Sequence, residues 1–316
     1  MPLDPNIAGL LSFMEALGAP AISEGTPEAA REAIRTLMVQ MRDEDTLAAV
    51  ASVEDITIDG RIPARVYRPV DQGDAVPTIV YYHGGGFVIG DLDTHDGICR
   101  LLSNDVDAVV VSVDYALAPE YRFPQAVEDS YRSLQWVAER IRDFGDDPAR
   151  IAVGGDSAGG NLAAVCAQLA HADGLALAAQ LLVYPAVDLL GDYPSREENA
   201  TGYFLTLDDM HWFAQHYLGG GETDPAVLAL ATDPRLSPLH AADLAGLAPA
   251  VVVTAEYDPL RDEGNVYAEH LAAAGVKVEH QQFPGLIHGF YGLEKISPAI
   301  AEATAWTNGA LRTLIG

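Results

Sequence analysis

Short apolar runs recur along most of the chain and alternate with stretches that show helical periodicity. The apolar runs span residues 78–82, 108–113, 151–153, 178–184, 250–255 and 276–283. The helical stretches that separate or follow them span residues 96–104, 124–144, 158–171, 261–274 and 298–314. Strands that are apolar on both faces and alternate with helices form mostly parallel sheets that helices cover on both sides. The pattern therefore predicts an α/β fold.

The chain departs from this rhythm before the first of these runs. Residues 5–17 and 26–41 carry amphipathic helical patterns, and the second opens with Thr26 followed by proline and glutamate, a typical N-terminal signal of a helix. Between residues 53 and 68, apolar and polar residues alternate around Asp59-Gly60. This alternation predicts an antiparallel hairpin with one face in solvent.

Another departure lies after the run at 178–184. Residues 186–240 contain no predicted strand, and they hold Pro194, consecutive glycines at 219–221 and a helical pattern near 207–217. Insertions in α/β enzymes tend to lie over the carboxyl ends of the strands, where ligands bind. We therefore expect a cap. The expected division is a cap of residues 1–48 and 186–240 over a catalytic domain of residues 49–185 and 241–316.

Composition narrows the classes of partner. With 316 residues, 49% of them hydrophobic, the chain can bury a large core. The formal net charge of −28, from 46 acidic and 18 basic residues, disfavours binding to nucleic acid or to an anionic membrane. A saline habitat and a demand for solubility explain this charge equally well. No apolar run reaches the roughly 18 residues of a membrane span, so we expect a soluble cytoplasmic protein. Cys99 and Cys166 are expected to be reduced thiols.

A glycine-rich motif follows the apolar run at 151–153. Gly155, Ser157 and Gly159 form a G-x-S-x-G pattern between that predicted strand and the helix predicted from residue 158. A sharp strand-to-helix turn brings the two flanking positions together, so glycine there avoids a clash and the serine stays exposed. The pattern predicts that Ser157 is a nucleophile. A glycine-rich turn with a capping serine is the structural alternative.

A second glycine run directly follows the strand predicted at 78–82, in the segment His83-Gly84-Gly85-Gly86-Phe87. Unhindered backbone N–H groups on such a loop can stabilise the negative oxygen of a tetrahedral intermediate. We expect the N–H groups of Gly84, Gly85 and Ala158 to form this oxyanion hole. The absence of a GK[ST] sequence and the glycine spacing exclude a phosphate loop and a dinucleotide-binding fingerprint.

A serine nucleophile needs a base and an orienting acid, which in this kind of fold follow in the order serine, acid, histidine. Asp258 and His288 come after the runs at 250–255 and 276–283, so both fall at carboxyl ends of predicted strands. Glu256 and Asp262 remain alternatives for the acid. The other histidines suit structural roles better: His171, His270 and His280 lie in or beside regular elements, His83 and His95 belong to loops, and His211, His216 and His240 belong to the insertion.

These motifs together resemble the hormone-sensitive-lipase-like (family IV) bacterial carboxylesterases. The resemblance rests, in chain order, on Tyr82-His83-Gly84-Gly85-Gly86, Gly90-Asp91, Asp114-Tyr115, Leu117-Ala118-Pro119-Glu120, Gly155-Asp156-Ser157-Ala158-Gly159-Gly160, Asp258-Pro259-Leu260 and His288-Gly289-Phe290. It implies an α/β-hydrolase fold, with a mostly parallel eight-stranded sheet flanked by helices and a helical cap. It also implies a triad of Ser157, Asp258 and His288, an oxyanion hole of Gly84, Gly85 and Ala158, and frequent homodimers. The implied reaction is hydrolysis of short- to medium-chain acyl esters without cofactor or metal. Ala116 departs from the family, which often has arginine there.

Other functions share parts of this pattern. A lipase acting on emulsified fats would need a broad apolar lid, whereas the insertion is acidic at positions 192, 197, 198, 208 and 209. A non-catalytic small-molecule receptor would be expected to have lost a member of the triad. Hydrolysis of lactones or amides uses the same residues and stays open. Substrate preference depends on a pocket between cap and sheet, for which we expect Phe87, Tyr203, Phe204, Trp212, Phe213 and Leu286.

Overall fold

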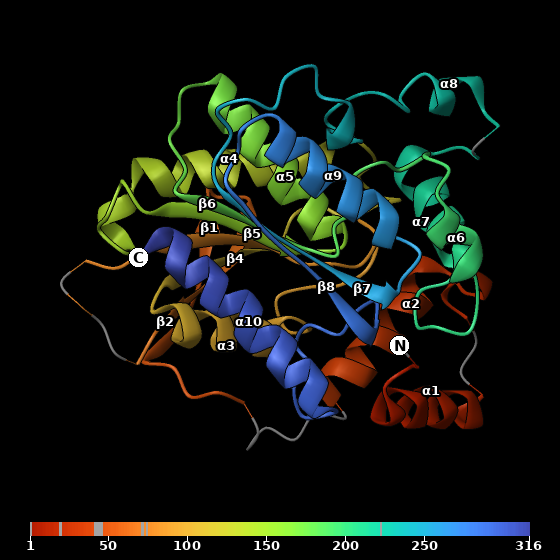
Figure 1. Cartoon of the computed structure of the whole chain (residues 1–316). Helices are drawn as coiled ribbons and strands as arrows, with labels where there is room; N and C mark the ends of the chain where they lie inside the picture. Colours follow the sequence, from red (N-terminus) through yellow and green to blue (C-terminus); the bar gives the residue numbers. More distant parts are fainter. Residues whose placement is uncertain (1, 19–20, 41–46, 71–72, 74, 222) are drawn as a thin grey trace.

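One sheet forms the centre of the computed structural model, which describes all residues except 1, 19–20, 41–46, 71–72, 74 and 222. Within this described part, eight strands pair in the order β1-β2-β4-β3-β5-β6-β7-β8 (Figure 1). β2 runs antiparallel to both of its neighbours, and the other neighbouring pairs are parallel. The strands are β1 (Ser52–Ile58), β2 (Ile62–Arg68), β3 (Thr78–Tyr82), β4 (Val109–Val113), β5 (Ile151–Asp156), β6 (Ala179–Val183), β7 (Ala250–Tyr257) and β8 (Val278–Ile287). The predicted mostly parallel α/β sheet is confirmed.

Burial along the strands follows their places in the sheet. Every position of the inner strands β3, β4 and β6 is buried, whereas β1, at one edge, exposes most of its side chains as the hairpin pattern predicts. The prediction for residues 276–283 was wrong in one respect. This segment forms the edge strand β8 and is half-buried rather than covered on both faces, because β8 has only β7 beside it among the described strands. Only its last positions, 285–287, are fully buried.

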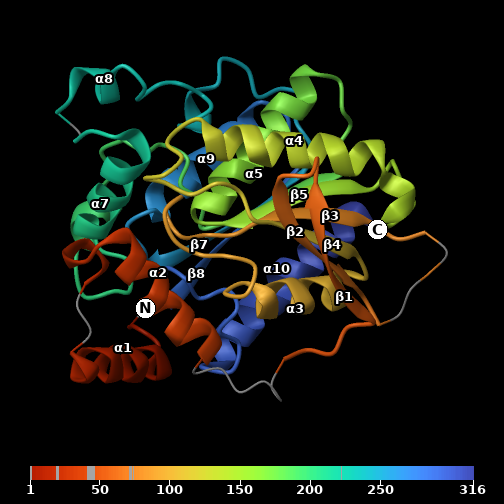
Figure 2. The same ribbon diagram turned by 180° about the vertical axis from the view of Figure 1, so that it is seen from behind.

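Helices cover both faces of the sheet. Helices α3 (Asp96–Val106) and α10 (Pro298–Ile315) lie on one face, and α4 (Gln125–Glu139), α5 (Ala158–Ala172) and α9 (Arg261–Ala273) lie on the other (Figures 1 and 2). The predicted helix at 124–144 ends at Glu139 and continues as a short 3-10 turn. A separate cluster of buried apolar side chains lies on each face. The helices pack on both faces of the sheet and hold the strands in place. The candidate active site lies at the carboxyl ends of these strands.

The N-terminal segment and the insertion lie together beside the carboxyl ends of the parallel strands (Figures 1 and 2). The N-terminal segment contains α1 (Pro5–Leu17) and α2 (Pro27–Arg35), and the insertion contains α6 (Pro194–Glu198), α7 (Leu207–Leu218) and α8 (Pro225–Leu228).

A direct hydrogen bond joins these two parts of the chain: the Ser23 N–H donates to Asp209 Oδ1 at 3.0 Å. Thr26 caps α2 as predicted, accepting from the Ala29 N–H at 3.3 Å. The helical pattern predicted to reach Met41 continues beyond α2 as a π turn over Thr36–Gln40, and Met41 itself lies outside the described residues. Among the helices described, none has the length and apolar character that crossing a membrane requires.

Candidate active site

Ser157 lies at a strained turn between β5 and α5. Its backbone has φ 56° and ψ −118°, a conformation that a residue with a side chain rarely adopts. The Ser157 N–H donates to the Val183 carbonyl of the neighbouring strand β6 at 2.9 Å, which ties the turn to the sheet. The geometry is that of a nucleophile elbow, which presents the hydroxyl at the end of the strand.

The glycines around Ser157 are required by close backbone contacts. A Cβ atom on Gly155 would lie 2.3 Å from the backbone of Gly159, and one on Gly159 would lie 1.9 Å from the Tyr82 carbonyl oxygen. Real Cβ atoms essentially never approach other atoms so closely. The G-x-S-x-G pattern therefore has a steric cause in this fold, as the sequence predicted.

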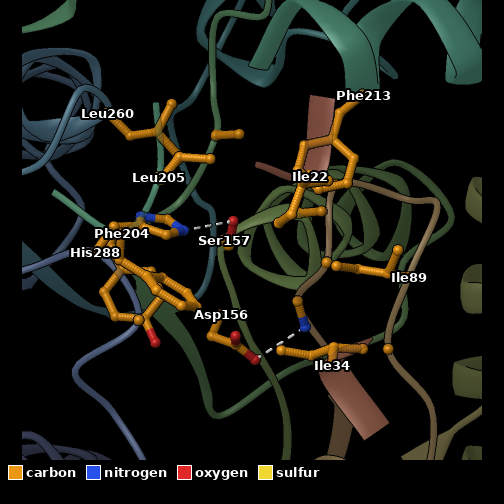
Figure 3. A pocket seen from close by; sticks show the side chains of 18 of the residues that line it. Ile22, Ile34, Ile89, Asp156, Ser157, Phe204, Leu205, Phe213, Leu260 and His288 are labelled. Carbon is orange, nitrogen blue, oxygen red and sulfur yellow. Dashed lines mark hydrogen bonds between the residues drawn. The ribbon is translucent and has the colours of Figure 1, made fainter. Parts of the chain in front are cut away.

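The predicted base and acid meet Ser157 in one hydrogen-bonded series, of which Figure 3 shows the contact between His288 and Ser157. His288 Nε2 lies 3.0 Å from Ser157 Oγ, and His288 Nδ1 lies 2.8 Å from Asp258 Oδ2. Asp258 is fully buried and His288 is 6% exposed. The second carboxylate oxygen of Asp258 accepts the Leu260 N–H at 2.8 Å, so the acid is held from two sides.

The structure gives the alternative acids other partners. The Glu256 carboxylate accepts the Gly285 N–H at 2.8 Å, and the Asp262 carboxylate accepts the Ser195 N–H at 2.8 Å. Asp258 is therefore the acid that contacts the histidine. Asn199 Nδ2, from the insertion, donates to the Asp258 carbonyl at 3.2 Å and connects the insertion to the acid loop. Sequence reasoning did not single out Asn199.

His83 supports the glycine loop. Its Nδ1 lies 2.8 Å from the Gly84 carbonyl oxygen, and its ring stacks on Tyr115 with centroids 4.4 Å apart. Burial, together with the neighbouring His95 ring, lowers the pKa of His83 to about 4. His83 is therefore uncharged at neutral pH.

The glycine loop differs from the prediction at its first glycine. Gly84 was expected to supply an oxyanion donor, but its N–H donates to Asp156 Oδ1 at 3.1 Å. An N–H that is bound to a carboxylate is not available to a developing oxyanion. Within the described chain, the N–H groups of Gly85, Gly86 and Ala158 donate to no protein acceptor, and all of these residues line the cavity at Ser157.

A cavity of about 420 Å³ opens at Ser157 and His288. Three of the predicted pocket residues, Phe87, Phe204 and Phe213, line it (Figure 3 labels the last two). The ring of Phe213 packs so closely on the glycine loop that a Cβ on Gly86 would lie 2.2 Å from it. Leu205 and Leu260 form another part of the wall (Figure 3).

The other predicted pocket residues lie outside this lining. Tyr203 packs on Tyr257 with ring centroids 4.8 Å apart, Trp212 packs on His216 at 4.3 Å, and Leu286 is buried in the core. The N-terminal segment, which the sequence analysis expected in a cap without naming lining residues, supplies much of the apolar wall. Its lining residues include Phe13, Met14, Ile22, Ile34, Leu37 and Met38.

One part of the cavity wall is charged. Arg196 of α6 and Glu263 of α9 both line the cavity, and Arg196 Nη2 lies 2.7 Å from Glu263 Oε2. Glu263 is fully buried and also accepts the Val187 N–H at 2.8 Å. Burial raises the pKa of Glu263 above its ordinary value, although Arg196 and the backbone donors oppose this effect.

A nucleophile elbow after a central strand, with histidine and acid on loops after later strands of the same sheet, defines the class of the molecule as an α/β hydrolase. A family model for the alpha/beta hydrolase fold matches residues 79–292. The chain is 42% identical to the carboxylic ester hydrolase LipN of Mycobacterium tuberculosis, over 98% of this chain and 82% of that protein.

Two further comparisons extend over almost the whole chain. The ethyl acetate hydrolase of Pseudomonas putida is 36% identical, with 99% of each protein covered. Among solved structures, the hyperthermophilic esterase from the archaeon Pyrobaculum calidifontis is 43% identical, with a TM-score of 0.90 and 99% of both chains covered. The chain belongs to the hormone-sensitive-lipase-like carboxylesterases of the α/β-hydrolase fold family, and it is an ester hydrolase.

Proposed function

We propose that the protein hydrolyses short- to medium-chain acyl esters through an acyl-enzyme on Ser157. The observation that carries this proposal is the series of contacts from Ser157 Oγ to His288 Nε2 at 3.0 Å and from His288 Nδ1 to Asp258 Oδ2 at 2.8 Å. The series ends at an apolar cavity large enough for a small ester.

The reaction proceeds in two transfers. His288 Nε2 takes the hydroxyl proton while Ser157 Oγ attacks the ester carbonyl carbon, and Asp258 stabilises the imidazolium that forms. The imidazolium then gives the proton to the departing alkoxide, leaving the acyl group on Ser157. A water molecule activated by His288 attacks this acyl group, and collapse of the second tetrahedral intermediate releases the acid and restores the Ser157 hydroxyl.

The negative oxygen of each tetrahedral intermediate would be stabilised by backbone N–H groups. We assign this role to Gly85, Gly86 and Ala158, replacing the Gly84 donor of the sequence prediction. Gly85 and Ala158 were expected from the sequence, whereas Gly86 takes part because the Gly84 N–H is bound to Asp156. Each donor to an oxyanion contributes on the order of 3 kcal/mol of barrier stabilisation.

The N-terminal segment and the insertion act in this proposal as a cap. Apolar side chains from both segments enclose the acyl and alcohol parts of the substrate, for example Ile34 from one and Phe213 from the other (Figure 3). Covering the site excludes water and strengthens the electrostatic interactions of the reaction.

The test is a series of p-nitrophenyl esters from acetate to palmitate, with wild type and Ser157→Ala. We expect the highest kcat/KM at short or medium acyl chains and a loss of at least about 10⁴-fold in kcat for Ser157→Ala. Emulsified tributyrin and triolein, aryl amides and lactones are measured alongside. Higher kcat/KM for triolein, for an amide or for a lactone would replace the proposed substrate class with lipase, amidase or lactonase activity. Full activity of Ser157→Ala would refute the mechanism.

A further inference from the structure

Asp156 lies between two parts of the proposed machinery but has no part in the transfers described above. It immediately precedes Ser157 and is 6% exposed. Its Oδ1 atom accepts the Tyr81 hydroxyl at 2.7 Å and the Gly84 N–H at 3.1 Å. One carboxylate oxygen thus connects strand β3, the nucleophile elbow and the glycine loop.

His95 lies beside the same contact. Its Nε2 lies 3.3 Å from the Gly84 nitrogen and 3.5 Å from Asp156 Oδ1. Its Nδ1 lies 3.0 Å from Thr94 Oγ1, and Thr94 is fixed in turn by the Asp91 N–H, which donates to Thr94 Oγ1 at 2.8 Å. The imidazole is therefore held at both nitrogens.

The contact between Asp156 and Gly84 is specific to glycine at that position. A Cβ on Gly84 would lie 2.3 Å from Asp156 Oδ2, so only a glycine allows the carboxylate to reach the backbone N–H. Because Gly85 and Gly86 follow directly in the chain, fixing Gly84 restricts where their N–H groups point. A displacement of about 1 Å in a reacting group lowers a rate by about 10²-fold.

We propose that Asp156 and His95 are positioning residues, which hold the Gly84 N–H and thereby align the oxyanion donors of the glycine loop with Ser157. This inference rests on the proposed function, since it presupposes the oxyanion step. Asp156 precedes Ser157 in the chain and binds the Gly84 N–H. It therefore fixes the position of the oxyanion donors relative to the Ser157 hydroxyl. His95 keeps the carboxylate and the Gly84 N–H in place.

The test uses the full chain with Asp156→Ala, Asp156→Asn and His95→Phe. Asparagine retains an acceptor oxygen, alanine removes it, and phenylalanine keeps the ring but removes both nitrogens. With p-nitrophenyl butyrate, we expect kcat to fall about 10–100-fold for Asp156→Ala, with KM within about threefold of wild type. Asp156→Asn is expected to recover most of this loss, and His95→Phe to lose about 3–10-fold in kcat.

An alkyl trifluoromethyl ketone separates positioning from general damage. Ser157 Oγ adds to its carbonyl carbon, the hydroxyl proton passes to His288, and the former carbonyl oxygen becomes an oxyanion. We expect its Ki to rise in proportion to the loss in kcat. The Ki of the corresponding trifluoromethyl alcohol, which occupies the cavity without forming an adduct, should stay within about twofold.

Arg132→Gln is the matched control, because Arg132 pairs with Asp59 on the surface away from the cavity. It should leave kcat and both Ki values unchanged. The proposal is overturned if Asp156→Ala lowers the melting temperature but leaves kcat and the ketone Ki unchanged. If Asp156→Ala does not fold, Asp156→Asn and His95→Phe decide: a parallel change in kcat and ketone Ki supports positioning, and unchanged values in both overturn it. A fully active Ser157→Ala would instead refute the proposed function, and with it this inference.

Discussion

Removing Arg196 from its buried pair with Glu263 should destabilise the protein in a pH-dependent way. In Arg196→Met, the Glu263 carboxylate keeps the Val187 and Asp188 N–H donors, at 2.8 and 3.2 Å, but loses the guanidinium. Leaving one partner of a buried pair without the other costs about 3–5 kcal/mol. Because the Val187 and Asp188 N–H groups still donate to Glu263, we expect the loss for this variant near the lower end of that range. With about 2.1 cal/mol/K of unfolding entropy per residue, a loss of about 3 kcal/mol lowers Tm by about 5 °C for this chain length.

The sign of the pH dependence follows from Glu263. Burial already raises the pKa of Glu263 above the ordinary value of 4.5, and Arg196 is the first of the groups that oppose this effect. Without Arg196 the pKa rises further. When the pKa of a carboxyl group is higher in the folded than in the unfolded state, the folded state binds the proton more tightly. The free energy of unfolding of the protein then falls as pH rises from the unfolded pKa to the folded pKa. The deficit of Arg196→Met should therefore be largest near about pH 8 and smaller near about pH 5.

Urea unfolding at both pH values measures the effect, with the double variant Arg196→Met/Glu263→Gln as control. The double variant carries neither charge, so it should be more stable than Arg196→Met at the higher pH. Its loss of unfolding free energy relative to wild type should not grow as pH rises. Equal losses for Arg196→Met at the two pH values would refute the reasoning. So would a double variant that is no more stable than the single one.

Three further outcomes are expected. Asp258→Asn should lower kcat by about 10³–10⁴-fold in p-nitrophenyl ester assays with an unchanged fold by circular dichroism, since the histidine loses its orienting carboxylate. Gly159→Ala should abolish activity and lower Tm, because its Cβ would lie 1.9 Å from the Tyr82 carbonyl oxygen. Burial and nearby carboxylates raise the pKa of Asp114 to about 6, so Asp114→Asn should stabilise the protein by about 1–2 kcal/mol near pH 8. In urea unfolding, this gain should disappear as pH falls through about 6 toward 4.

The turn that carries Ser157 could be predicted from the sequence because its causes are local. The elbow needs glycine on both sides of Ser157, and those glycines stand within two positions of it in the chain. Asp258 and His288 could be placed because each follows an apolar run, and the carboxyl ends of parallel strands lie at one edge of the sheet. The contacts of 3.0 and 2.8 Å among these groups follow from that topology.

The role of Gly84 could not be predicted in the same way. Three successive glycines offer three N–H groups, and the sequence does not say which of them is already bound. The answer depends on the parallel pairing of β3 with β5, in which Tyr82 lies opposite Gly155. That register brings Asp156, the next residue of β5, beside the loop that follows β3. The contact is tertiary, so a pattern within one segment carries no sign of it.

Two errors in the predicted pocket, Trp212 and Leu286, have a common cause, which is the choice of residues by type rather than by their phase in a helix or strand. On α7, Met210, Phe213 and Ala214 line the cavity, and these positions share one face of a helix. Trp212 lies about 100° around the helix axis from Phe213. It packs instead on His216, one turn further along the helix. On β8, Ile287 lines the cavity and the preceding Leu286 does not, as expected from the alternation of side chains along a strand. A prediction that first fixed the phase of each element from Phe213 and Ile287 would have rejected Trp212 and Leu286 on geometry alone.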